Sequence, residues 1–168
     1  DLLKQPPSLN LNDRTWVIHT RSEERPPVMI HTGAIVRESL ITDGSIIAEG
    51  ALIENSVLSP GVYVGPNAVV RESVILTDTY IEAGAVVERC IVDKIAVIGH
   101  GAHVGSIPDM GDLGITCVGK NTHVPAGYVV GHSCILGTDL RLEDFARFKD
   151  KYVPAGTNIT RPSAGKHD

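Results

Sequence analysis

The sequence repeats one five-residue stretch four times: Arg37-Glu38-Ser39-Leu40-Ile41, Glu54-Asn55-Ser56-Val57-Leu58, Arg71-Glu72-Ser73-Val74-Ile75 and Glu88-Arg89-Cys90-Ile91-Val92. Each copy begins 17 residues after the previous one. A constant period of this size is typical of repeat proteins, in which each repeat forms one structural unit that stacks on its neighbours. The repeat therefore predicts a solenoid.

Aliphatic residues recur within each period at spacings of 5, 6 and 6, as follows: Val36, Ile41, Ile47, Ile53, Leu58, Val64, Val70, Ile75, Ile81, Val87, Val92, Ile98 and Val104. Except before Val64, a small residue stands two positions ahead of each of them, beginning with Ala34, Ser39 and Ser45. Three short inward-facing segments per period, each followed by a turn, describe a coil with three flat sides. Successive coils lie about 4.8 Å apart, so each aliphatic side chain stacks over its copy. The pattern predicts an all-β fold, a parallel β-helix of hexapeptide repeats, whereas a sandwich of short strands would not produce a constant period.

The repeat sets the expected division of the chain into three parts. Residues 1–30 form an extended linker, residues 31–136 form the β-helix, and residues 137–168 form a C-terminal cap and tail. The pattern breaks at 105–114, which indicates a loop inserted into a coil, and the side of the prism to which Val118 belongs stays open. An open end of a β-helix exposes unpaired backbone groups. The stretch 137–152, with Phe145 and Phe148 and with Leu142, Phe145 and Ala146 at helical spacing, is expected to cover it. Val153-Pro154-Ala155-Gly156 resembles Val124-Pro125-Ala126-Gly127, so a last strand is expected at Thr157 and Ile159.

Composition excludes several classes of protein. The formal charge of -5 comes from interspersed acidic and basic residues, so no basic stripe indicates a nucleic-acid partner. The 3 cysteines, without a C-x-x-C pair, argue against a disulfide framework and a structural zinc site and favour a cytoplasmic location. No apolar run approaches the roughly 18 residues of a membrane span, so no membrane partner is expected.

Four histidines are candidates for chemistry: His100, His103, His123 and His132. Hexapeptide acyltransferases use a histidine as general base, and gamma-class carbonic anhydrases bind zinc through histidines on such a prism. Both alternatives stay open. His103 and His123 each fall between the small and the aliphatic residue of a pair and should point outward into solvent. No carboxylate partner stands at a recognisable spacing, so the sequence assigns no catalytic residue and no metal ligand.

The segment 13–27 carries a resemblance to a known family. Asp13-Arg14-Thr15-Trp16-Val17-Ile18-His19-Thr20 and Arg25-Pro26-Pro27 resemble the segment that joins the two domains of glucose-1-phosphate adenylyltransferases. Ser56-Val57-Leu58-Ser59-Pro60-Gly61-Val62 and Ile91-Val92-Asp93-Lys94 resemble the β-helix of the same family, and the similarity extends to about Val130. The resemblance implies a left-handed coil and a non-catalytic C-terminal domain for assembly and regulation.

The resemblance also implies partners. In that family an N-terminal domain, missing here, uses magnesium to transfer an adenylyl group from ATP to glucose 1-phosphate, releasing pyrophosphate and making ADP-glucose for glycogen. This chain would need no cofactor of its own, would form a homo-oligomer and would have no adenylyltransferase activity alone. Arg21 and Arg25, near the domain junction, are candidates for binding a small anionic effector, and the alternative is two solvated linker charges. The loop 106–113 lacks the Lys or Arg of family members that sugar phosphates activate, which argues against activation through that loop.

Overall fold

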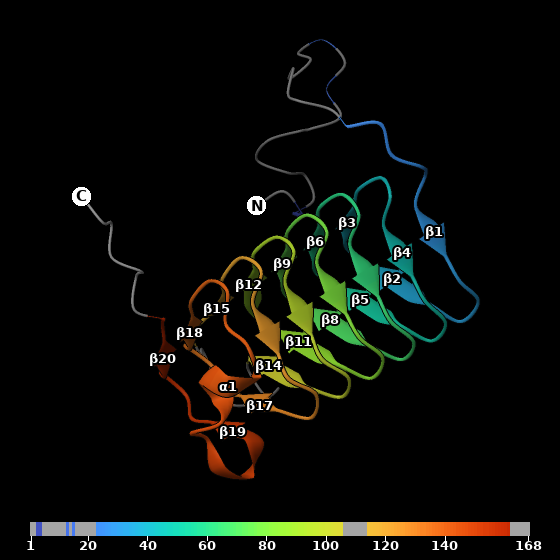
Figure 1. The fold of residues 1–168 in the computed structure, drawn as a ribbon. Helices are drawn as coiled ribbons and strands as arrows, with labels where there is room; N and C mark the ends of the chain where they lie inside the picture. Colours follow the sequence, from blue (N-terminus) through green and yellow to red (C-terminus); the bar gives the residue numbers. More distant parts are fainter. Residues whose placement is uncertain (1–2, 5–12, 14, 16–22, 106–113, 162–168) are drawn as a thin grey trace.

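The protein is described here from a computed structural model, which describes residues 3–4, 13, 15, 23–105 and 114–161. Its strands form three parallel sheets that make the three sides of a prism, and the coils stack along one axis (Figure 1). The predicted parallel β-helix is confirmed, and its handedness stays a prediction of the family resemblance. None of the helices in the described residues is long and apolar enough to cross a membrane.

Every third strand along the chain joins the same sheet until the C-terminal end. Sheet A contains β1 (Met29–Ile30), β4 (Ile46–Ile47), β7 (Tyr63–Val64), β10 (Tyr80–Ile81), β13 (Val97–Ile98) and β16 (His123–Val124). Sheet B contains β2 (Ile35–Arg37), β5 (Leu52–Glu54), β8 (Val69–Arg71), β11 (Val86–Glu88), β14 (His103–Gly105), β17 (Val129–Val130) and β19 (Tyr152–Val153). Sheet C contains β3 (Leu40–Ile41), β6 (Val57–Leu58), β9 (Val74–Ile75), β12 (Cys90–Val92), β15 (Thr116–Val118), β18 (Ile135–Leu136) and β20 (Asn158–Ile159).

The core is the aliphatic ladder that the spacing predicts. Val70, Val87 and Val104 stack in register on neighbouring strands of sheet B, and all three are 0% exposed. The inward residues of the first coil are less buried, because among the described residues this coil stacks on one neighbour only. Ile30, which is in register with the fully buried Ile47, is 53% exposed.

Small residues close the corner between sheets B and C through a ladder of hydrogen bonds. The Ser73 hydroxyl donates to the Arg71 carbonyl at 2.6 Å and accepts from the Cys90 backbone N–H at 3.0 Å. Ser56 does the same one coil earlier, accepting from the Ser73 N–H at 3.1 Å. The repeat residue that precedes each small residue adopts positive φ, for example 46° at Glu72. This backbone region is uncommon for residues other than glycine, so the serine hydrogen bonds support a corner that local preference alone disfavours.

The insertion falls between β14 and β15, and the coil resumes in sheet C. Val118 pairs with Val92 of β12 and with Leu136 of β18. Val118 therefore belongs to sheet C, the side of the prism that the sequence left open, and it continues the ladder of that sheet across the insertion.

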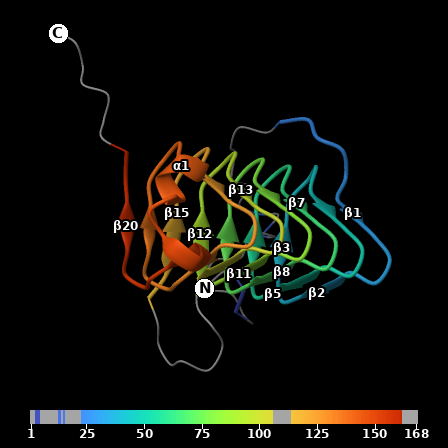
Figure 2. The ribbon, with the colours of Figure 1, turned by 60° about the horizontal axis from the view of Figure 1, so that its bottom comes forward.

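At the C-terminal end, strands and cap interleave within residues 137–161, and β20 lies at the last strand expected from Thr157 and Ile159. β19 and β20 extend sheets B and C beyond residue 136, whereas sheet A ends at β16. At the end of sheet A, Leu140 accepts a hydrogen bond from the His123 N–H at 3.0 Å, and helix α1 (Leu142–Phe145) and the 3₁₀ turn η1 (Lys149–Lys151) follow (Figure 2). Phe145 is 0% exposed and packs edge-on against Tyr128, with ring centroids 5.6 Å apart. The helix expected at Leu142 and Phe145 is present and covers the end of the core.

Candidate functional site

Arg25 lies where the chain enters the prism, across the corners of successive coils. The Pro26 carbonyl accepts a hydrogen bond from the Gly44 N–H at 2.6 Å, which ties the entering segment to the corner between sheets C and A. The Arg25 guanidinium reaches Asp78 through two hydrogen bonds of 2.6 and 3.0 Å, and it also donates to Glu23 at 2.8 Å. Gly61 has a φ of 73°, a conformation that favours glycine, and a side chain there would displace the Arg25 guanidinium from Asp78. Arg21 lies outside the described residues.

The electrostatics of this cluster favour the ion pair. Hydrogen bonding to Asp78 and Glu23 raises the pKa of Arg25, and the Arg25 guanidinium holds the pKa of Asp78 below its usual range. Asp78 therefore stays ionised at neutral pH and loses the pair only as the pH falls through its lowered pKa. Two carboxylates around one guanidinium leave the cluster with net negative charge. An anionic effector would have to displace Glu23 or Asp78 to reach Arg25.

A second cluster joins Glu88, Arg71 and His103 on three neighbouring strands in the middle of sheet B, β11, β8 and β14. Arg71 donates to Glu88 at 2.6 Å, and the His103 Nε2 lies 3.4 Å from the other Glu88 oxygen. The Glu88 side chain is 5% exposed, and among the described atoms its Oε2 and the His103 Nε2 make no hydrogen bond. Sequence reasoning found no carboxylate partner for His103 and missed Glu88. The signal was present, since Glu88 is 17 residues before Gly105 and Gly105 is two residues after His103.

The same cluster ends a ladder of alternating charge along sheet B. Arg37 lies 3.8 Å from Glu54, and Glu54 lies 3.5 Å from Arg71. These are the first residues of successive copies of the repeat, one 17-residue period apart. The arginine and glutamate side chains of this ladder neutralise one another, so the ladder does not resemble a binding site for an ionic ligand.

His123, Cys90 and Cys134 lie apart from these clusters. His123 points outward on β16, and burial lowers its pKa, with Arg141 nearby adding to the effect. Cys90 and Cys134 are buried, and burial raises the pKa of both thiols. In the part of the chain that the structure describes, no three His, Cys, Asp or Glu side chains come together to hold a metal ion.

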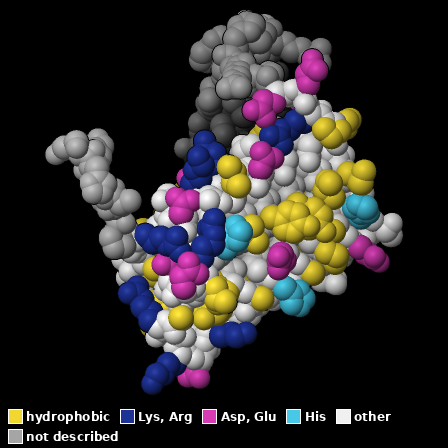
Figure 3. Space-filling view, viewed as in Figure 1, with side chains coloured by type: hydrophobic (Ala, Val, Ile, Leu, Met, Phe, Trp, Pro, Cys, Tyr) yellow, Lys and Arg dark blue, Asp and Glu magenta, His cyan; other side chains and the backbone are white. Residues whose placement is uncertain are grey.

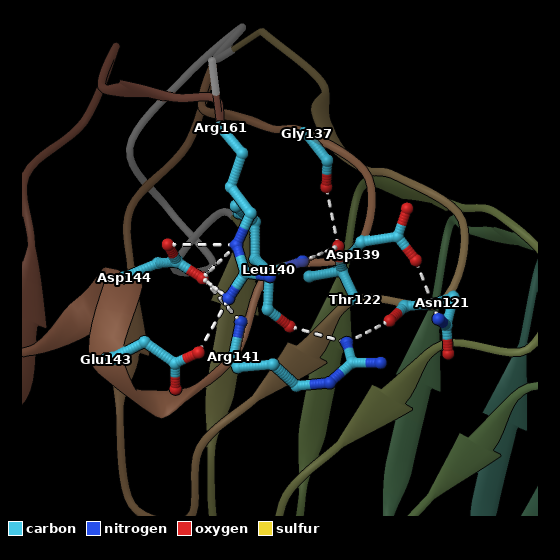
Figure 4. A network of polar contacts seen from close by, with 9 residues as sticks. All are labelled: Asn121, Thr122, Gly137, Asp139, Leu140, Arg141, Glu143, Asp144 and Arg161. Carbon is cyan, nitrogen blue, oxygen red and sulfur yellow. Dashed lines mark hydrogen bonds and ion pairs between the residues drawn. The ribbon is translucent and has the colours of Figure 1, made fainter. Parts of the chain in front are cut away.

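The C-terminal cap carries the densest polar network (Figure 4). Arg161 donates to Asp144 at 2.9 Å and to Glu143 at 2.7 Å, and Asp144 accepts from the Arg141 N–H at 2.7 Å. Arg141 in turn donates to the backbone carbonyls of Asn121 and Leu140. The bonds of Arg161 join α1 to the chain after β20, and the bond from Arg141 to Asn121 joins the start of α1 to the turn before β16, so the network holds the cap on the last coils.

Comparison with known proteins first identifies a family. The family described as "GlmU-like, C-terminal hexapeptide" matches residues 28–112. A protein of Thermomicrobium roseum named glucose-1-phosphate adenylyltransferase is 44% identical over 167 residues, covering 94% of this chain and 38% of the relative. A protein of the same name from Bacillus mycoides is 49% identical over 47 residues, which are 28% of this chain and 12% of that protein. The chain thus spans well under half of the length of these relatives.

Solved structures share the fold at low sequence identity. The UDP-N-acetylglucosamine acyltransferase of Francisella novicida superposes with a TM-score of 0.56 at 22% identity, over 66% of this chain and 46% of that chain. A putative acetyltransferase from Desulfovibrio desulfuricans gives a TM-score of 0.51 at 14% identity, over 82% of this chain and 27% of the other. At these identities the comparison shows a common β-helix and nothing further about chemistry.

Proposed function

Since the chain belongs to the GlmU-like, C-terminal hexapeptide family, we propose that it is the non-catalytic assembly and regulatory domain of a sugar nucleotidyltransferase that resembles glucose-1-phosphate adenylyltransferase. One observation carries this proposal. The alignment with the Thermomicrobium roseum protein covers 94% of this chain but only 38% of the relative, so most of the relative has no counterpart here. The nucleotide chemistry and its magnesium would belong to an upstream catalytic domain, and the three unpaired cysteines fit a cytoplasmic protein.

The described surface supports a role without catalysis. Adenylyl transfer needs convergent basic groups and a carboxylate-held metal around a triphosphate. Here the guanidinium groups of Arg25, Arg71 and Arg161 each bind carboxylates of the same chain, at corners or edges of separate coils. The outward positions of the strands are largely apolar, which suits contact with other protein surfaces.

We expect the purified chain alone to release no pyrophosphate from ATP and glucose 1-phosphate in the presence of magnesium. The reason is that a β-helix of this kind offers separate flat faces rather than a cleft of converging donors. The measurement is a coupled pyrophosphate assay against a blank without protein. Turnover that a substitution within this chain abolishes would refute the proposal.

Two alternatives remain from other classes, an acyltransferase and a carbonic anhydrase. An acyltransferase of this fold would form trimers with acyl-CoA between prisms, and a carbonic anhydrase would carry stoichiometric zinc. Light scattering and metal analysis of the purified chain distinguish them from the proposed role. A trimer that binds acyl-CoA would favour the first, and bound zinc with hydration of carbon dioxide would favour the second.

We propose that Arg21 and Arg25 contribute to the effector response of the longer protein. For Arg25→Ala in that protein, the effector concentration at half-maximal response should rise about fivefold, the scale of one surface ion pair. The matched control is Arg37→Ala, because Arg37 is an exposed arginine with a carboxylate neighbour, Glu54, on sheet B. An unchanged response in Arg25→Ala would mean that Arg25 only ties the linker to the prism.

A further inference from the structure

The outward face of sheet A carries an apolar column that runs across the prism. Its apolar members are in register on neighbouring strands, and His123 follows them on the last strand: Met29, Ile46, Tyr63, Tyr80, Val97 and then His123. Tyr63 and Tyr80 stack at the middle, with ring centroids 4.2 Å apart and an interplanar angle of 13°. Hydrophobic side chains cross the face shown in Figure 3, and Met29 and Tyr80 are 53% and 45% exposed. An exposed apolar patch with tyrosines at its centre is typical of a protein interface.

Two acidic residues border this column in one half, and a lysine and a histidine border it in the other. Asp43 and Glu49 flank β4, whereas Lys94 and His100 flank β13. Asp43 and Lys94 occupy equivalent positions at one corner, where their carbonyls accept from the Gly61 and Asn121 N–H groups of the next coil. Glu49 and His100 are equivalent at the other corner, where their carbonyls accept from the N–H groups of residues 67 and 127. All four residues are exposed.

The two flanked strands lie symmetrically about the centre of the sheet. Sheet A has the order β1-β4-β7-β10-β13-β16, so its midpoint falls between β7 and β10, which carry the stacked tyrosines. β4 and β13 are equally distant from this midpoint. A two-fold axis through the midpoint and parallel to the strands would exchange β4 with β13.

Resting on the proposed assembly role, we propose that sheet A docks a second copy of this chain face to face with the two solenoids antiparallel. Rotation about that axis brings Asp43 against Lys94 of the second copy and Glu49 against His100 of the second copy. Symmetry repeats each pair, giving four contacts of opposite or complementary charge around paired apolar columns. The Tyr63–Tyr80 stack meets its own copy at the centre.

The opposite arrangement is disfavoured by charge. If the axis ran along the solenoid, β4 would face β4 with its two corners exchanged. Asp43 would then meet Glu49, and Lys94 would meet His100. The repulsion between Asp43 and Glu49 would suppress association in that arrangement, so the corner residues favour antiparallel solenoids.

The size of the face sets the expected strength of the dimer. Six strands at spacings of about 4.8 Å span about 24 Å, which places the interface at the small end of specific ones. The dimer is therefore expected to form in a concentration-dependent way. Sedimentation equilibrium of the 168-residue chain over a wide range of concentrations measures it directly.

The first test removes apolar contact from the proposed face. Tyr80→Ser should abolish the dimer, whereas the matched variant Ile91→Ser, on the outward face of sheet C and 40% exposed, should keep it. Thermal melts by circular dichroism check that both variants fold. A dimer lost in Ile91→Ser and kept in Tyr80→Ser would overturn the choice of face while leaving an assembly role in place. A chain that stays monomeric at every concentration would overturn the inference, and pyrophosphate release would still test the non-catalytic role separately.

The second test determines the direction of the solenoids. Asp43→Lys should weaken the dimer about tenfold, because in each half of the interface the new lysine then faces Lys94 of the other copy. Adding Lys94→Asp should restore it by exchanging the charges. If Asp43→Lys instead strengthened the dimer, the new lysine would be facing Glu49 and the antiparallel arrangement would be wrong. No change in either variant would also overturn it.

Discussion

Val87→Asp is expected to lower the free energy of unfolding by about 4 kcal/mol or more, a large part of the stability of a domain of this size. Val87 is 0% exposed and stacks between Val70 and Val104 in sheet B, so an aspartate there would place an unpaired carboxylate in a dry aliphatic ladder. Urea denaturation followed by circular dichroism measures the change.

The matched control is the same substitution one residue earlier. Val86 lies on the same strand, but its side chain faces outward and is only half-buried. A shift of one residue along a strand exchanges the two faces, so Val86→Asp should cost less than about 1 kcal/mol. Equal losses in the two variants would show that the inward register is wrong.

Phe145→Ala is expected to cost about 3–5 kcal/mol, because it removes a large side chain from a site that the surrounding residues can fill only in part. Phe145 is 0% exposed, and its ring contacts Tyr128 edge-on at the end of the core. Local unfolding should begin at the C-terminal coils. Hydrogen exchange is therefore expected to show β16, β17 and β18 opening before the central strands, while urea denaturation gives the total change.

Phe148→Ala serves as the matched control for the cap. Phe148 is half-buried and lies under the Arg147 guanidinium, 4.9 Å from its ring centroid. Its removal should cost about 1 kcal/mol, the scale of an exposed cation–π contact with some packing. If the two variants behaved alike, α1 would not be the element that closes the prism.

The fold was predictable because the repeat is visible in the sequence. In a solenoid each coil contacts its neighbours, so a residue and its copy 17 positions later share one environment and the pattern of aliphatic residues records the burial directly. Val70, Val87 and Val104 are examples. The charge alternation of Arg37, Glu54, Arg71 and Glu88 follows from the same period, since residues in equivalent positions lie side by side in sheet B.

The candidate site was less predictable, because its contacts do not follow one period. Arg25 lies outside the repeat and meets Asp78, 53 residues later, across several coils. The sequence singled out Arg25 through its family resemblance, but it carried no signal for the carboxylates that bind this side chain. His103 likewise meets Glu88 through the diagonal between neighbouring strands rather than through equivalent positions.

By itself, the sequence determined the class of fold, the inward residues and the place of the insertion, because each depends on a local pattern repeated in every coil. Only the tertiary structure decided that Val118 continues sheet C, that sheet A ends at β16 under Phe145, and that Asp43 and Lys94 lie symmetrically about a tyrosine stack. These features depend on how many coils are stacked and on how an interrupted coil resumes. Such contacts between distant residues are set by the packing of the whole prism, which no single period of the sequence contains.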